Sequence, residues 1–197
     1  MQLMLLPCYE GESYDGDLSP FHPLHGEMRE DAMHQFLIAL SRYGDRDFTS
    51  TDPHAIVARL MQREDAVIGG GLVAVKGEYR LYPGCCCGLE SWRDWQGLRP
   101  LSQNAVWLGH DPNAWVDSTG PRAVLHNDQS KALEALEVDY AEIDAASHQA
   151  GIDLEEFMLA LELWLTGLDI ADAEAVCAKI TNWFWIGPAG AIRAAGN

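Results

Sequence analysis

Basic residues are scarce in this 197-residue chain, which has 13 lysines and arginines against 30 aspartates and glutamates, and a formal net charge of −17. The scarcity is greatest between Asp128 and Glu174, where one lysine stands against thirteen carboxylates. The negative electrostatic potential of these carboxylates repels nucleic acids and anionic lipid surfaces, and it attracts cations and basic proteins. The composition therefore predicts no nucleic-acid partner and favours a basic protein partner.

Long hydrophobic runs are also missing, and no secretory leader is expected from the first residues. The first seven residues contain no basic region and end at Pro7, and no later stretch approaches the length of a membrane span. The five cysteines do not form the even, regularly spaced set of a secreted disulfide scaffold. We therefore expect a cytoplasmic protein with reduced thiols and no membrane partner, and a homo-oligomer is compatible with the sequence.

Familiar catalytic motifs are missing as well. The glycines at 69–71 lack the lysine and the following helix of a phosphate-binding loop, and no serine lies in a nucleophile elbow. No cofactor is predicted. A chain of this length buries roughly 70 % of its unfolded surface in one core. We therefore predict a single domain over residues 1–197.

The N-terminal third is expected to pass from irregular structure to helices. Residues 1–27 are rich in Gly, Pro, Ser and His, lack sustained periodicity, and indicate an irregular lead-in. Residues 28–65 carry two helical patterns. The first runs from about Arg29 to Tyr43 with one apolar stripe, and the second starts at Pro53 behind the capping residue Asp52.

The middle of the chain, residues 66–138, changes to a strand-like period. Residues 66–75 and 78–82 flank a glycine turn and predict a β-hairpin. Two further short strands are expected over residues 105–108 and 122–126. Residues 135–140 fit either a strand or a helix, and we favour the strand, because a capping box at Asp139 would start a helix after Val138.

Residues 139–187 return to a helical pattern. Capping signals predict three helices, which begin at Asp139, Asp153 and Asp169. The second should bury the stripe Leu154, Phe157, Met158, Leu161, Trp164 and Leu165. Segregated helices and strands predict an α+β fold with a mainly antiparallel sheet of about 4–6 strands, flanked by helices, and with a helical C-terminal third.

Three consecutive cysteines, Cys85, Cys86 and Cys87, are an unusual feature. Zinc sites commonly separate their thiolate ligands by two or more residues, so this spacing argues against a metal. Flanking glycines instead indicate a tight turn that holds small buried side chains before a short helix. The alternative is a thiol- or metal-dependent enzyme whose site gathers these cysteines and His110.

The acidic segment is the main candidate for a binding surface. Residues expected to contact a basic partner are Glu142, Asp144, Glu155, Glu156, Glu162, Trp183 and Trp185. The carboxylates have few bases near them in sequence and should lack intrachain ion pairs, while tryptophan is enriched in interface hot spots. The alternative is a surface whose charges only cap helices and keep the protein dissolved.

Two motifs carry a resemblance to known sequences. The stretches 82–95 and 107–115 contain Pro-Gly-Cys-Cys and Gly-His-Asp-Pro, and the region 66–165 resembles a group of uncharacterised bacterial proteins that share both. Size, acidity and element order are remotely similar to SUKH-type immunity proteins of bacterial toxin systems. The Leu-Pro-x-x-Tyr opening pattern of that type is missing, so no functional residue is transferred.

Charge and resemblance together favour binding over catalysis. We predict a bacterial protein-binding module, with an immunity protein that neutralises a basic toxin as the specific candidate.

Overall fold

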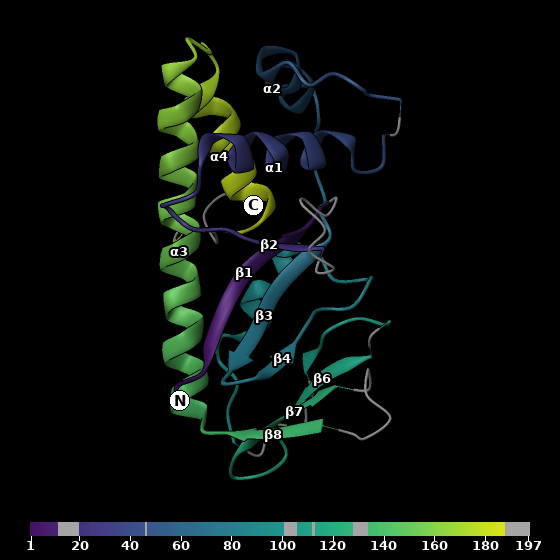
Figure 1. The fold of residues 1–197 in the computed structure, drawn as a ribbon, viewed down its shortest axis with the longest axis vertical. Helices are drawn as coiled ribbons and strands as arrows, with labels where there is room; N and C mark the ends of the chain where they lie inside the picture. The colour runs from purple at the N-terminus through teal and green to yellow at the C-terminus, as the bar shows by residue number, and fades with distance from the viewer. Residues whose placement is uncertain (12–19, 46, 101–105, 112, 128–133, 188–197) are drawn as a thin grey trace, which may run out of the picture. The chain divides into compact units, whose positions relative to one another are not determined.

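A computed structural model of the protein describes residues 1–11, 20–45, 47–100, 106–111, 113–127 and 134–187. The strands in these ranges are β1 (Met4–Glu10), β2 (Phe21–Pro23), β3 (Gly70–Lys76), β4 (Tyr79–Leu81), β5 (Val106–Trp107), β6 (Ala114–Asp117), β7 (Ala123–Asn127) and β8 (Glu134–Val138). The helices are α1 (Glu30–Arg42), α2 (Pro53–Met61), the 3-10 helix η1 (Leu89–Trp95), α3 (Tyr140–Gly167) and α4 (Ala173–Trp183) (Figure 1). The predicted α+β class is confirmed. No helix in the described part of the chain is long and apolar enough to cross a membrane.

The described residues divide into two compact units, each built from two segments of the chain. Unit 1 contains Met1–Cys8 and Gly69–Ala150, and unit 2 contains Tyr9–Ile68 and the chain from Gly151 onward. Strand β1 and helix α3 each run through both units. The prediction of one domain over residues 1–197 stays a prediction.

The strands form two four-stranded sheets, with the orders β2-β1-β3-β4 and β5-β6-β7-β8. The first contains the predicted hairpin, in which Lys76 lies opposite Tyr79 across a turn at Gly77 with a φ of 63°. In the second sheet each neighbouring pair is antiparallel, as where Leu125 lies opposite Leu136. The Tyr79 hydroxyl donates to the Leu125 carbonyl at 3.0 Å and connects β4 to β7. The predicted antiparallel strands are thus present as two sheets.

The helices of unit 2 follow their local sequence signals. The Asp52 carboxylate accepts a hydrogen bond from the Ala55 amide at 3.2 Å and caps α2, as predicted. Phe36 of α1 and Phe157 of α3 are fully buried, and their rings meet edge to face with centroids 5.0 Å apart. The predicted stripe on α3 is confirmed at five positions, whereas Trp164 is only half-buried.

The irregular lead-in predicted over residues 1–27 is wrong where β1 and β2 form. That prediction rests on the Gly, Pro, Ser and His content and the lack of sustained periodicity. Pro7, which donates no hydrogen bond to a sheet, lies inside β1. However, Leu5, Cys8 and Tyr9 of β1 are each about 2 % exposed. Burial of these side chains stabilises the strand on both sides of the proline.

The helix start predicted at Asp153 is also wrong, because α3 is continuous from Tyr140 to Gly167. A glycine inside a helix costs only about 1 kcal/mol relative to alanine, so Gly151 cannot end a helix alone. The neighbouring Ala150 and Leu154 are fully buried and favour continuation. Strand β6 was not predicted from the sequence.

Candidate functional site

The three consecutive cysteines lie in the loop between β4 and η1, as predicted. The Cys87 amide donates to the Gly84 carbonyl at 3.0 Å and closes a tight turn. Their side chains diverge, since Cys87 is buried while Cys85 and Cys86 are exposed. The prediction of buried cysteines is therefore confirmed for Cys87 and wrong for the other two.

A second loop, between β5 and β6, lies against the cysteine loop and carries His110. Two backbone hydrogen bonds join these loops: the Gly84 amide donates to the Leu108 carbonyl at 2.6 Å, and the Cys85 amide donates to the His110 carbonyl at 2.7 Å. The donors of both hydrogen bonds are the backbone amides of exposed Cys85 and of its neighbour Gly84. The position of His110 beside the thiols is therefore fixed by main-chain contacts.

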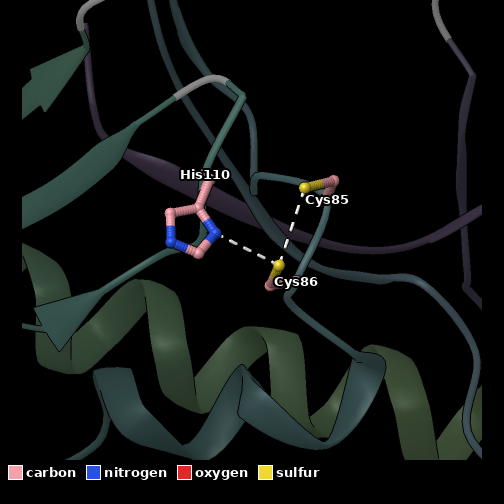
Figure 2. A group of neighbouring side chains, drawn as sticks. All are labelled: Cys85, Cys86 and His110. Atoms are coloured by element: carbon pink, nitrogen blue, oxygen red, sulfur yellow. Dashed lines mark hydrogen bonds between the residues drawn. The ribbon is translucent and has the colours of Figure 1, made fainter.

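Three potential ligand atoms converge at this point. Figure 2 shows the His110 ring turned toward the Cys86 sulfur, with Nδ1 and Sγ 3.2 Å apart. The Cys85 and Cys86 sulfurs are 3.6 Å apart, and all three ligand atoms lie within 4.8 Å of one another. We call Cys85, Cys86 and His110 the thiol–imidazole cluster. It contains two of the three cysteines in the predicted alternative site, together with its histidine.

The close approach of the two loops depends on a glycine. Gly109 has a φ of 95°, a conformation that side chains disfavour. A Cβ atom at Gly109 would lie 2.9 Å from the Cα, carbonyl carbon and carbonyl oxygen of Gly84. The glycine beside His110 is therefore required by both conformation and space.

The thiol pKa is raised at both Cys87 and Cys85, for different reasons. Burial raises the pKa of the Cys87 thiol to about 11, so it stays protonated at neutral pH. The pKa of Cys85 is also raised, first by its hydrogen bond with Cys86, then by desolvation, and also by the charges of Cys86 and Asp111. A nearby cation would oppose these effects of negative charge on Cys85.

An aromatic side chain also contacts the histidine ring. The Trp107 ring meets the His110 ring edge to face, with centroids 4.8 Å apart. Trp107 is itself 47 % exposed. This contact limits the directions in which His110 can turn, which favours the orientation drawn in Figure 2.

Two of the predicted partner-binding carboxylates are engaged in intrachain ion pairs. Glu142 accepts a hydrogen bond from the Lys76 ammonium at 2.7 Å, and Asp144 lies 3.1 Å from the Arg99 guanidinium. The pKa of Glu142 is lowered, chiefly by the hydrogen bond from Lys76. The expectation of unpaired carboxylates is therefore wrong here, because the bases come from distant segments of unit 1.

The remaining predicted carboxylates, Glu155, Glu156 and Glu162, lie on the unit 2 part of α3. The first two are exposed and the third is half-buried. In the described part of the chain none of them lies within 4.0 Å of a basic side-chain nitrogen. They differ in this respect from Glu142 and Asp144.

Two leucines lie among these carboxylates and were not predicted as site residues. Leu159 is 60 % exposed and Leu163 is 66 % exposed. They are four residues apart on α3, so they share one side of the helix with Glu155 and Glu156. We call Glu155, Glu156, Leu159, Glu162 and Leu163 the α3 acidic face. The sequence feature that could have revealed this face is the presence of two leucines outside the buried stripe of α3.

The two predicted tryptophan anchors differ from each other. The Trp183 indole donates to the Glu64 carbonyl at 2.9 Å, and Lys179 lies over its ring at 5.4 Å. Trp183 thus holds α4 to the segment that follows α2. Trp185 is 49 % exposed and has a φ of 53°. Of the two, Trp185 is the more accessible to a partner.

Comparisons with protein-family models, with curated proteins and with solved structures found no match for this chain. The two candidate sites are therefore defined by their own chemistry. The thiol–imidazole cluster offers soft sulfur and nitrogen ligands to a cation. The α3 acidic face offers apolar side chains surrounded by negative charge.

Proposed function

We propose that the protein is a protein-binding module whose α3 acidic face binds a basic partner. The observation that carries this proposal is the exposure of Leu159 and Leu163 among carboxylates that form no ion pairs in the described part of the chain. Exposed leucines on a helix contribute helix propensity but no burial of apolar surface to the isolated protein. They gain stability only when another surface covers them.

The apolar and acidic side chains would have different effects on binding. Full burial of a leucine contributes about 1.5–3 kcal/mol, so covering two that are about two-thirds exposed would contribute about 1–2 kcal/mol each. Exposed carboxylates at the rim of an interface act mainly on the rate of encounter. A basic protein would therefore be attracted by the glutamates and retained by the leucines.

Within this function, the role that we propose is that of an immunity factor in the bacterial cytoplasm, which covers the basic surface of a toxin. The net charge of −17 supports it, because a toxin that acts on nucleic acid presents a basic surface to its substrate. The resemblance to bacterial sequences that share the Pro-Gly-Cys-Cys and Gly-His-Asp-Pro motifs supports a bacterial origin.

The test uses the basic protein encoded beside this chain's gene, because immunity factors are encoded next to their toxins. Association and dissociation rates are measured by stopped flow at several salt concentrations. Replacing Glu155, Glu156 and Glu162 by glutamine should slow association at low salt with little change in dissociation. Replacing Leu159 and Leu163 by serine should instead speed dissociation.

A matched control removes the same charge elsewhere in unit 2. Asp169, Asp172 and Glu174 are also exposed, and they lie outside the α3 acidic face. Replacing them by their amides should affect association less than the triple glutamine variant does. The proposal is wrong if both charge variants behave alike and the leucine variant dissociates at the unchanged rate.

A further inference from the structure

The thiol–imidazole cluster plays no part in the proposed binding face. Its three side chains are exposed, come from two different loops, and point toward one another (Figure 2). Sequence spacing argued against a metal because three consecutive cysteines cannot easily surround one ion. In this cluster the third ligand comes from the second loop and Cys87 takes no part, so only two adjacent cysteines must converge on the ion, and their sulfurs already lie 3.6 Å apart.

Two of the three distances between ligand atoms agree with those around a tetrahedral zinc ion. Zn–S bonds of about 2.3 Å and a tetrahedral angle place two sulfur ligands about 3.8 Å apart, and a sulfur and a nitrogen ligand about 3.5 Å apart. The corresponding distances are 3.6 Å between the Cys85 and Cys86 sulfurs and 3.2 Å between Cys86 Sγ and His110 Nδ1. The third pair of ligand atoms, on Cys85 and His110, lies within 4.8 Å, and side-chain rotation of these exposed residues would complete the geometry.

We propose that Cys85, Cys86 and His110 bind one thiophilic cation of the Zn²⁺ class, with the fourth coordination position open to solvent or to a further ligand. Two thiolates and one imidazole suit zinc and disfavour magnesium or calcium, which prefer oxygen ligands. Three protein ligands with one open position differ from a closed structural site. The cluster therefore allows exchange at the metal.

The surroundings support this assignment in two ways. The edge-to-face contact with Trp107 restrains His110, and the two main-chain hydrogen bonds hold the loops together, so little ordering is required on binding. Asp111 contributes negative charge close to Cys85, which favours a cation. Binding would form two metal–thiolate bonds and one metal–nitrogen bond and would release two thiol protons to solvent, with no oxidation or reduction.

The inference is independent of the proposed function and is tested on the full-length, reduced, metal-free protein. Zn²⁺ is titrated in competition with a chromogenic chelator, and Co²⁺ is added separately as a spectroscopic probe. We expect one ion per chain and a Co²⁺ spectrum with intense tetrahedral d–d bands and a thiolate-to-metal charge-transfer band. A stoichiometry well below one, or a Co²⁺ spectrum without the thiolate band, would overturn the proposal.

Variants locate the site. Cys86→Ser and His110→Gln should each weaken Zn²⁺ binding by at least about 100-fold, because losing even an outer-shell partner costs about 10–100-fold. Cys87→Ala is the matched control, since it removes the adjacent thiol that lies outside the cluster. Urea unfolding of each metal-free variant separates loss of binding from loss of folding. If folded Cys86→Ser or His110→Gln binds Zn²⁺ as tightly as the Cys87→Ala control, the assignment is wrong.

Discussion

Replacing Gly109 by alanine tests the contact that brings the histidine loop onto the cysteine loop. The new Cβ atom would lie 2.9 Å from three backbone atoms of Gly84. Backbone atoms cannot move away as a flexible side chain could, so the loops must separate. The hydrogen bonds that join them, from Gly84 to Leu108 and from Cys85 to His110, would then lengthen.

The expected loss of unfolding free energy in Gly109→Ala is the sum of two costs. Alanine at a positive φ costs about 1–2 kcal/mol, and overpacking a tight contact costs about 1–3 kcal/mol. Gly109→Ala should therefore lower the free energy of unfolding by about 2–5 kcal/mol. Gly97 isolates the first cost, because it has a φ of 81° and would place its Cβ in open space. Gly97→Ala should cost only about 1–2 kcal/mol.

The assay is equilibrium unfolding in urea, monitored by tryptophan fluorescence and by circular dichroism. The difference between the two variants, about 1–3 kcal/mol, measures the close approach alone. The entropy that the unfolded chain loses when glycine is replaced by alanine is the same in both variants and cancels. Equal destabilisation of Gly109→Ala and Gly97→Ala would refute the account of the loop contact. Zn²⁺ affinity should also fall in Gly109→Ala and stay unchanged in Gly97→Ala.

Two other predictions concern α3. Phe157→Ala should lower the free energy of unfolding by about 3–5 kcal/mol, because Phe157 is fully buried against Phe36, whereas exposed Leu163→Ala should change it by less than about 0.5 kcal/mol. Similar losses would show that the buried and exposed sides of the helix are misassigned. The pKa of Glu142 is lowered from its ordinary 4.5 by Lys76, so its stabilising contribution is present above that pH and disappears as pH falls through the lowered value. Glu142→Gln should therefore be less stable than the parent at pH 7, and the difference between their unfolding free energies should shrink as the pH falls below 4.5; a constant difference would contradict this.

Local signals in the sequence predicted the local elements well. Asp52 and Pro53 determine the start of α2 through a side-chain cap and a fixed φ, and both effects act within one helical turn. Gly77 marks the hairpin turn for a similar reason, since its φ of 63° favours glycine. Each of these signals works without help from the rest of the chain.

The candidate site could not be predicted in the same way. Cys86 and His110 are brought together by hydrogen bonds between two loops, and neither loop carries a sequence signal for its partner. The pairing of Lys76 with Glu142 likewise joins residues far apart in the chain. Gly151 illustrates the opposite error, because its local preference to end a helix is overcome by burial on both sides. Tertiary contacts decide all three cases.

The division of each unit into two chain segments has a consequence for folding during synthesis. Phe36 leaves the ribosome about 120 residues before its partner Phe157, a delay of about 6–24 s at usual rates of translation. During that time the apolar side of α1 has no α3 to cover it. Strand β1 likewise waits for β3, which closes a loop of roughly 60 residues. The nascent chain thus depends on late contacts of high sequence separation, which slow folding and make an early-bound chaperone beneficial.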